Sequence, residues 1–275
     1  MEHMNATCPR HGEYSDPSGR RHITECPDCQ REAQRAHHDF RMRWGDYEHW
    51  WRCGIPARYR SRTLANWTPE GTAQQTAATA VQGYAERIRQ RVEAGDGLTV
   101  LGPPGTGKTH LLTALVTAAH HAGIRGLYWS WPALIDEHRS SFKSPPDDPA
   151  RRFMDNAATC PLLALDEIGH GTGTEWERLQ LFELIDYRYR EGLPILTASN
   201  ATTKTLADLI GERLADRLRE INAPVPIPGE SQRARVKHDN TPAMDPPPES
   251  ITITYHALGD MQEREITRPE TRYSR

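Results

Sequence analysis

Residues 102–109 carry the most specific chemical signal in this sequence. They read GPPGTGKT, which matches G-x-x-x-x-G-K-[ST], between an apolar run and a helical pattern. Glycines let the backbone turn so that its N–H groups point at phosphate oxygens. Lys108 supplies a charge for the β- and γ-phosphates, and the Thr109 hydroxyl suits Mg²⁺. A glycine-rich turn could match by chance, but the strand–loop–helix context favours a nucleotide site. The predicted contact residues are Gly102, Pro103, Pro104, Gly105, Thr106, Gly107, Lys108, Thr109 and His110.

Two acidic residues end the most apolar run of the chain. Residues 162–167 read LLALDE, so Asp166 and Glu167 stand at the carboxyl end of an expected strand. There Asp166 would hold Mg²⁺, directly or through water, and Glu167 would polarise an attacking water as a general base. Asn200 ends the strand-like run ILTASN. It could orient the same water, or it could simply cap the following helix.

Arg213 and Arg217 lie four residues apart in GERLADRLRE, residues 211–220, and hence on one helical face. One interpretation is a solvated face on which both arginines pair with nearby acids. The other is an arginine finger that reaches the nucleotide of a neighbouring subunit. Taken alone, these residues favour the solvated face.

Four residues near the N-terminus have metal-ligand chemistry. They are Cys8, His11, Cys26 and Cys29. Zn²⁺ prefers four sulfur or nitrogen donors in a tetrahedron, and two short turns can supply them without a large core. The spacing therefore predicts a zinc site, with His22 as an alternative ligand; the other interpretation is four unconnected residues in a flexible tail. Cys53 and Cys160 fall outside the spacing and are expected to be packing residues.

Alternating strand-like and helix-like runs from about residue 57 to 237 must position these groups. Expected strands cover 98–101, 126–131, 162–165, 195–198 and, at an edge, 224–228. Expected helices cover 73–94, 108–121, 132–142, 174–190 and, in two segments, 204–220, with a short helix after the SPPDDP break. The buried face of the 174–190 helix is expected to contain Trp176, Leu179, Phe182, Leu184 and Ile185. Apolar strands joined by helices predict an α/β fold with a parallel sheet covered on both faces.

The amino-acid composition excludes some classes of protein but does not identify the function. The 275 residues carry 34 Lys+Arg against 37 Asp+Glu, a formal charge of −3, with a mean hydropathy of −0.75. This balance excludes a simple polybasic nucleic-acid binder, and no apolar run is long enough for a membrane span. The five cysteines and the absence of a signal-peptide pattern predict a cytoplasmic protein with reduced thiols.

Shifts in composition predict four regions. They are a zinc-binding module at 1–30, a basic aromatic helix at 31–55, the α/β domain at 56–237, and a Pro-rich linker and C-terminal tail at 238–275. The tail is expected to be disordered except for one edge strand at 251–255.

The segments GPPGTGKTHLLTAL, LLALDEIG, ILTASN and IGERLADRLR, in this order, resemble the DnaC/IstB group of AAA+ ATPases, and most closely the DnaC-type helicase loaders. The resemblance covers about residues 59–236. It implies an AAA+ P-loop core in which residues 102–109 form Walker A, Asp166 and Glu167 belong to Walker B, and Asn200 is sensor 1. This sequence shows no obvious lid domain with a second sensor arginine, which leaves the binding of adenine open.

The resemblance also implies ATP-dependent self-association into a spiral. Arg213 and Arg217 then fall in the arginine-finger box of the family, with Arg217 preferred and Arg213 as its rival. In such loaders a segment between the second strand and Walker B often faces single-stranded DNA. Here that segment is 132–156, although a solvated basic surface would look the same. Its basic residues are Arg139, Lys143, Arg151 and Arg152.

Loaders grip the replicative helicase with their N-terminal region, so the resemblance assigns residues 31–51 to contact with a DnaB-like hexamer. This stretch could instead fold back on the zinc module or bind DNA. Its aromatic residues are Phe40, Trp44, Tyr47, Trp50 and Trp51.

The leading hypothesis is an ATP-dependent loader of a DnaB-like replicative helicase onto single-stranded DNA, with ATP, Mg²⁺ and Zn²⁺ as cofactors. The alternative is an IstB-type transposition helper ATPase that acts with a transposase on duplex DNA. The zinc module and aromatic helix favour the loader. A nucleotide-switch adaptor with negligible turnover is a third hypothesis, which the intact Asp-Glu pair disfavours.

Overall fold

The computed structural model describes residues 6–14, 26–143, 145, 152–170, 173–232, 248, 250–257 and 260–267. Within these ranges, the side chains of residues 6, 44–51, 255–257 and 260–261 are not described. The chain divides into two compact units, residues 1–49 with 245–275 and residues 50–244. Helix α1, Pro27–Arg52, begins in the first unit and ends in the second.

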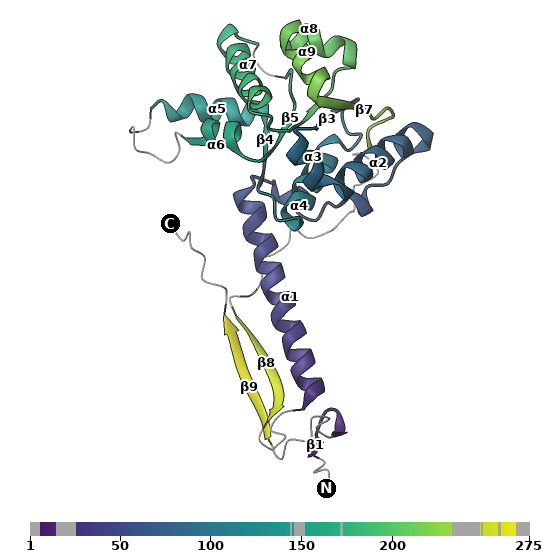
Figure 1. Cartoon of the computed structure of the whole chain (residues 1–275), viewed down its shortest axis with the longest axis vertical. Coiled ribbons are helices and arrows are strands. Elements are labelled where there is room, and N and C mark those ends of the chain that lie inside the picture. The colour runs from purple at the N-terminus through teal and green to yellow at the C-terminus, as the bar shows by residue number, and fades with distance from the viewer. Residues whose placement is uncertain are drawn as a thin grey trace. The chain divides into compact units, whose positions relative to one another are not determined.

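A five-stranded parallel sheet forms the centre of the larger unit, which confirms the predicted α/β fold (Figure 1). Its strand order is β4-β5-β6-β3-β7. The bounds are Gly97–Leu101 for β3, Gly126–Ser130 for β4, Leu162–Asp166 for β5, Ile195–Ser199 for β6 and Asn222–Pro226 for β7. Every residue of β3, β5 and β6 is buried, as expected for strands inside a covered parallel sheet. Strand β7 lies at the edge, where proline is tolerated because one side needs no ladder hydrogen bonds.

Helices connect the strands close to the expected positions. Their bounds are Gly71–Glu86 for α2, Ile88–Ala94 for α3, Lys108–His121 for α4, Trp131–Ser141 for α5, Phe153–Thr159 for α6, Glu175–Arg190 for α7, Thr203–Ile210 for α8 and Glu212–Ile221 for α9. Two 3-10 turns, η1 (Ala57–Tyr59) and η2 (Leu64–Asn66), precede them. The single helix expected at 73–94 is interrupted at Arg87, whose φ of −113° and ψ of 23° leave the helical region.

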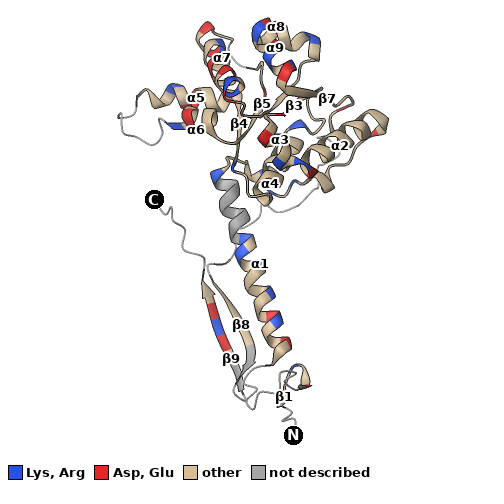
Figure 2. Cartoon of the chain, viewed as in Figure 1, with Lys and Arg blue, Asp and Glu red and all other residues tan. Residues whose placement is uncertain are grey.

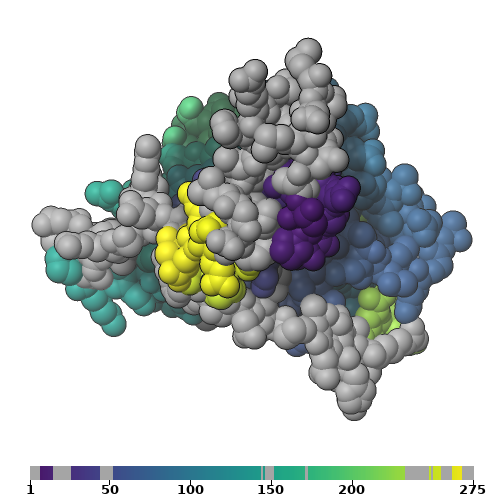
Figure 3. Space-filling model, turned by 90° about the horizontal axis from the view of Figure 1, so that it is seen from below, coloured from purple at the N-terminus to yellow at the C-terminus, as the bar shows by residue number. Residues whose placement is uncertain are grey.

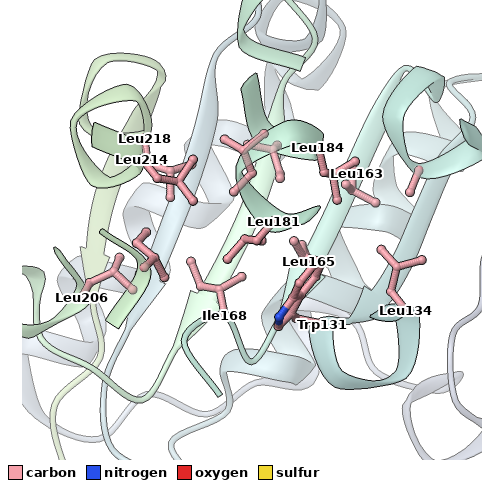
Figure 4. Close-up of a cluster of buried hydrophobic side chains, with 14 of the residues drawn as sticks. Trp131, Leu134, Leu163, Leu165, Ile168, Leu181, Leu184, Leu206, Leu214 and Leu218 are labelled. Atoms are coloured by element: carbon pink, nitrogen blue, oxygen red, sulfur yellow. The ribbon is translucent and has the colours of Figure 1, made fainter. Parts of the chain in front are cut away.

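A continuous apolar core packs helices α5 to α9 against the sheet (Figure 4). Helix α7 contributes Leu181, Leu184 and Ile185, which are at most 4% exposed. The expectation that Leu179 belongs to this face is wrong, since Leu179 is 50% exposed. Two residues correspond to a rotation of about 200° around a helix, which places Leu179 opposite Leu181.

The smaller unit contains two antiparallel hairpins and most of α1. Strands β1 (Ala6–Cys8) and β2 (Gly12–Tyr14) form one, and β8 (Ser250–Ala257) and β9 (Asp260–Thr267) form the other. The expectation of one edge strand in a disordered tail is therefore wrong for residues 260–267, which pair with β8. Figure 3 shows both hairpins in space-filling form, β8–β9 in yellow and the N-terminal one in purple.

Contacts between distant parts of the chain hold the smaller unit together. Arg10 donates hydrogen bonds to Glu32 Oε2 at 2.8 Å and to the carbonyl oxygen of Thr254 at 3.3 Å. Ile253 of β8 is 8% exposed. Basic residues recur along the described part of α1, and β9 contains Glu263 and Glu265 (Figure 2). Among the described residues, no helix combines the length and apolar character that crossing a membrane requires.

Candidate nucleotide-binding site

The phosphate loop, residues 102–109, joins β3 to α4. Gly105 and Gly107 have φ angles of 83° and 99°, in the left-handed region that favours glycine. A Cβ atom at Gly107 would also lie 2.3 Å from Trp67 Nε1, so a larger residue cannot fit there. Helix α4 begins directly after Gly107, and its first N–H groups therefore face the loop as an anion-binding end.

Lys108 lies inside the loop and is only 8% exposed. Its Nζ donates hydrogen bonds to the carbonyl oxygens of Gly102 and Pro103, both at 2.7 Å. The Thr106 hydroxyl donates to the same Pro103 carbonyl at 3.0 Å. These bonds hold the ammonium where it can exchange carbonyl oxygens for phosphate oxygens.

Asp166, at the end of β5, accepts three hydrogen bonds. The Thr109 hydroxyl donates to Asp166 Oδ2 at 2.6 Å, and the Tyr128 hydroxyl donates to the same oxygen at 3.0 Å. The backbone N–H of Glu167 donates to Oδ1 at 2.8 Å. The structure thus brings together Thr109 and Asp166, a hydroxyl and a buried carboxylate. Hard oxygen donors of this kind fit Mg²⁺.

Sequence reasoning missed Tyr128, which is 6% exposed on β4. Burial, together with the neighbouring Asp166 carboxylate, raises the pKa of Tyr128. The phenol is therefore protonated and donates at neutral pH. Nothing in the local pattern GLYWS marks this residue as polar and functional.

Glu167 and Asn200, the two residues predicted to act on water, line one cavity of about 470 Å³. Glu167 has a φ of 58°, the one positive value among the described non-glycine residues. Left-handed backbone costs an ordinary residue about 1–2 kcal/mol, which is typical of functional sites. Asp166 is buried and Glu167 is exposed. Asp166 therefore lies at the cation position, whereas Glu167 faces the cavity.

A segment beyond the sheet closes against the phosphate loop. The backbone N–H of Gln232 donates to the carbonyl oxygen of Gly105 at 3.0 Å. Gln74 of α2, 1% exposed, donates to the carbonyl oxygen of Pro228 at 2.7 Å and holds this segment in place. These contacts join residues far apart in the chain, so no sequence pattern pointed to them.

The nucleoside end of the site could be formed by residues before α2. His110 Nε2 donates to the carbonyl oxygen of Thr63 at 2.8 Å. Trp67 is 6% exposed beside Gly107, and within the described part of the chain its indole N–H has no hydrogen-bond partner. Leu64, Trp67 and Leu111 help line a groove of about 430 Å³. Such a groove could accept a base.

Helix α9 presents its two arginines differently. Arg217 is 19% exposed and forms an ion pair with Asp186 of α7. Its guanidinium carbon lies 4.8 Å from the centre of the Phe182 ring and 5.4 Å from that of Tyr189. Arg213 is exposed and lies 4.9 Å from the same Phe182 ring. Arg217, which the resemblance favoured as the finger, is thus paired within its own subunit, whereas Arg213 is the more exposed of the two.

Comparison with known proteins identifies the family. Residues 75–240, more than half of the chain, match the family described as IstB-like ATP binding protein. The chain belongs to this family. A replicative helicase loader DnaC from Buchnera aphidicola (subsp. Schizaphis graminum) is 26% identical over 168 residues, 61% of this chain and 67% of that protein. An insertion sequence IS21 putative ATP-binding protein from Pseudomonas aeruginosa is 32% identical over 151 residues, 53% of this chain and 56% of that protein.

Solved structures agree with this membership and confirm the AAA+ core. The crystal structure of the DnaC helicase loader is 27% identical, with a TM-score of 0.57 over 62% of this chain and 98% of that one. The replication initiator DnaA bound to AMPPCP and single-stranded DNA is 25% identical, with a TM-score of 0.52 over 62% of this chain and 50% of that one. Both likenesses extend over less than two thirds of this IstB-like protein.

The smaller unit of this IstB-like protein brings the four predicted metal ligands together. The ligand atoms of Cys8, His11, Cys26 and Cys29 all lie within 4.8 Å of one another. Cys29 Sγ is 3.6 Å from Cys8 Sγ and 3.3 Å from His11 Nδ1. A zinc tetrahedron with S and N donors has edges of about 3.5–3.8 Å. The donor set and its spacing therefore fit zinc, which these residues could hold.

The electrostatics of the cluster act on its ligands in opposite directions: they hold a proton on His11 and promote ionisation of Cys8. Glu32, missed by sequence reasoning, accepts a hydrogen bond from His11 Nε2 at 3.1 Å and raises the pKa of His11 to about 9. Metal-ligating histidines commonly have such a carboxylate partner. Burial opposes ionisation of Cys8, but hydrogen bonds from the backbone of Arg10 and His11 lower the pKa of its thiol to about 6. The packing role expected for Cys53 and Cys160 is confirmed, since both are buried.

Several predictions fall outside the described part of the chain. These concern His22, Arg151 and the side chains of Trp44, Tyr47, Trp50 and Trp51. Of the other residues expected to contact partners, Phe40 is 4% exposed. Arg139 donates to Glu177 at 2.8 Å and to Asp136 at 3.2 Å, so its charge is already shared with acids.

Proposed function

We propose that the larger unit binds ATP with Mg²⁺ and hydrolyses it between subunits of an assembly. The phosphate loop and Lys108 would hold the phosphates, and Thr109 with Asp166 would hold the cation. Glu167 would polarise the attacking water and Asn200 would orient it, while an arginine of α9 from the neighbouring subunit would stabilise the transition state. The observation that carries this proposal is the 2.6 Å hydrogen bond between Thr109 and Asp166, because it unites Walker A and Walker B.

We further propose that this ATPase loads a DnaB-like replicative helicase onto single-stranded DNA in the cytoplasm. Relatives and a structural neighbour named as DnaC helicase loaders support this role. ATP binding would build the loader assembly on DNA, and hydrolysis would release the helicase. The smaller unit lies entirely outside the family match and would supply the helicase contact.

Exposed residues of α1 are the proposed contact surface for the helicase. Met42 is 48% exposed, and Arg35, Arg41 and Arg43 are also exposed. An apolar side chain among arginines suits a protein interface with an acidic partner surface. Phe40 is buried and would support the helix instead of contacting the partner.

Single-stranded DNA would contact the region of α5 and α6 through its backbone. Lys143 and Arg152 are exposed there. Contacts of this kind are electrostatic, so binding should weaken steeply as salt increases. Arg139 would contribute less than the sequence suggests, because Glu177 and Asp136 already share its charge.

A transposition helper that acts with a transposase on duplex DNA is the second candidate. The IS21 relative, at 32% identity, favours it. The metal cluster with its surrounding unit favours the loader, because this additional unit suits a dedicated protein partner.

The test is light scattering after size-exclusion chromatography of the full chain, mixed with the replicative helicase of its own source, with and without ATP. A stable complex in the wild type that is lost on Met42→Asp would support the loader and locate its contact. Lys108→Ala should make complex formation independent of ATP. Lys204→Ala, at an exposed lysine of α8, serves as the matched control.

The outcomes separate the two candidates. If no complex forms with ATP or without it, the loader proposal is wrong. Binding to a transposase and duplex DNA under the same conditions would then support the transposition role.

A further inference from the structure

Tyr128 is the residue of the cation site that no sequence motif includes. Its hydroxyl lies 3.0 Å from Asp166 Oδ2, the same oxygen that accepts the Thr109 hydroxyl at 2.6 Å. Two donors from different elements, β4 and α4, thus converge on one carboxylate oxygen of β5. The site is buried, since Asp166 is 2% exposed and Tyr128 is 6% exposed.

This convergence fixes the orientation of the cation ligands. The proton of the Thr109 hydroxyl points at Asp166 Oδ2, which leaves the lone pairs of the hydroxyl oxygen for a cation. Asp166 must keep its rotamer for this orientation to persist. Tyr128 restrains Oδ2 from the side of β4, and the Glu167 N–H restrains Oδ1 at 2.8 Å.

The backbone of Tyr128 is itself held from outside the sheet. β4 is an edge strand, and the connector after α1 lies against it at Cys53 and Gly54. The Tyr128 N–H donates to the carbonyl oxygen of Cys53 at 2.7 Å. Gly54 approaches so closely that a Cβ there would lie 2.5 Å from the Tyr128 carbonyl oxygen. Tyr128 is therefore fixed at both its backbone and its hydroxyl.

We infer that Tyr128 is a positioning residue for Mg²⁺, which orients the Asp166 carboxylate and through it the Thr109 hydroxyl. This inference rests on the proposed function, since it assumes that the loop binds a magnesium nucleotide. The inference distinguishes the contacts that hold the phosphates from the contacts that hold Mg²⁺. Lys108 and the loop N–H groups hold phosphates without Mg²⁺, and only the cation ligands depend on Tyr128.

The experiment compares Tyr128→Phe with Tyr84→Phe in the full chain. Tyr84 of α2 is 4% exposed and donates its hydroxyl to the carbonyl oxygen of Asp96 at 2.9 Å, so its variant loses a comparable buried hydrogen bond outside the cation site. Binding of a fluorescent ATP analogue is measured in EDTA and across a Mg²⁺ titration. Thermal melting of both variants reports on folding.

Tyr128→Phe should bind the analogue in EDTA as the wild type does. Loss of a group that orients metal ligands typically lowers metal affinity about 10-fold or more, so the Mg²⁺ midpoint should rise by about that factor. Excess Mg²⁺ should restore binding, and Tyr84→Phe should keep the wild-type midpoint.

Two results would overturn the inference while leaving the proposed function intact. One is a Tyr128→Phe midpoint equal to that of Tyr84→Phe. The other is an equal loss of affinity with EDTA and with Mg²⁺, which would indicate a general structural role. If the wild-type protein binds no nucleotide at all, the proposed function fails and the inference fails with it.

Discussion

Arg188 of α7 provides the sharpest test of how the core of the larger unit is stabilised. It is fully buried, and it donates to backbone carbonyl oxygens and, at 3.6 Å, to Cys160 Sγ. Nη1 donates to Ala157 at 2.9 Å, to Ala158 at 3.0 Å and to Cys160 at 2.9 Å. Nη2 donates to Pro194. One guanidinium therefore satisfies the end of α6 and the turns that lead into β5 and β6.

We predict that Arg188→Met lowers the free energy of unfolding by about 3 kcal/mol. Methionine keeps the length of the side chain but donates no hydrogen bond, so four carbonyl oxygens, three of them in buried residues, lose a partner. An unsatisfied buried group costs about 1–3 kcal/mol, and the low end applies because each carbonyl can relax toward other donors. Methionine also avoids the desolvation that lowers the pKa of the buried arginine, which returns about 1 kcal/mol.

Urea unfolding followed by circular dichroism measures this loss. Arg190→Met on the same helix is the control, because Arg190 is 65% exposed and its ion pair with Asp186 at 3.2 Å should contribute less than about 1 kcal/mol. If both variants lose the same small amount, the carbonyl contacts of Arg188 do not stabilise the fold and the reasoning is refuted.

Two further predictions concern the sites. Arg213→Ala should lose assembly-stimulated ATP hydrolysis with little change in melting temperature. Arg217→Ala should chiefly lower the melting temperature, because Asp186 loses this ion-pair partner. Normal stimulated ATP hydrolysis in Arg213→Ala would instead assign the arginine finger to Arg217. Zinc affinity should rise between pH 6.5 and pH 8.5, because the raised pKa of His11, about 9, means that zinc must displace its proton throughout that range. Competition with a chelating dye at the two pH values measures this. Because the cysteine ligands must also lose protons, His11→Ala should show a smaller rise in affinity, and an unchanged rise would contradict the assignment of His11 as a ligand.

Sequence reasoning succeeded where neighbouring residues determine the structure. The phosphate loop depends on glycines within a few residues of one another, and α4 begins and ends at the expected Lys108 and His121. The four metal ligands occur as two short pairs, and each pair needs only a tight turn. The prediction from the sequence failed at β9, because its sequence DMQEREIT lacks the apolar alternation of a typical strand. That strand forms because its partner β8 lies beside it, with Ile266 opposite Ile251.

The arginines of α9 show a second kind of feature that the sequence alone does not predict. Their spacing predicts one helical face, and both guanidinium groups do lie near Phe182 of α7. The spacing could not show that Asp186, one turn further along α7, pairs with Arg217 and leaves Arg213 exposed. Which of two equivalent arginines is available depends on the register between two helices, and that register is a property of the packed core.

The position of Tyr128 likewise depends on how two strands pair, which the sequence alone does not predict. In the β4–β5 register, Tyr128 is opposite Ala164 and Ser130 is opposite Asp166. Side chains two residues apart share a face of the sheet, so Tyr128 and Asp166 lie on the same side. A phenol is long enough to reach a diagonal neighbour, whereas a serine is not. A shift of one residue would turn Tyr128 to the opposite face, away from the carboxylate. The chemistry of the cation site therefore depends on strand order and register, which no single motif in the sequence encodes.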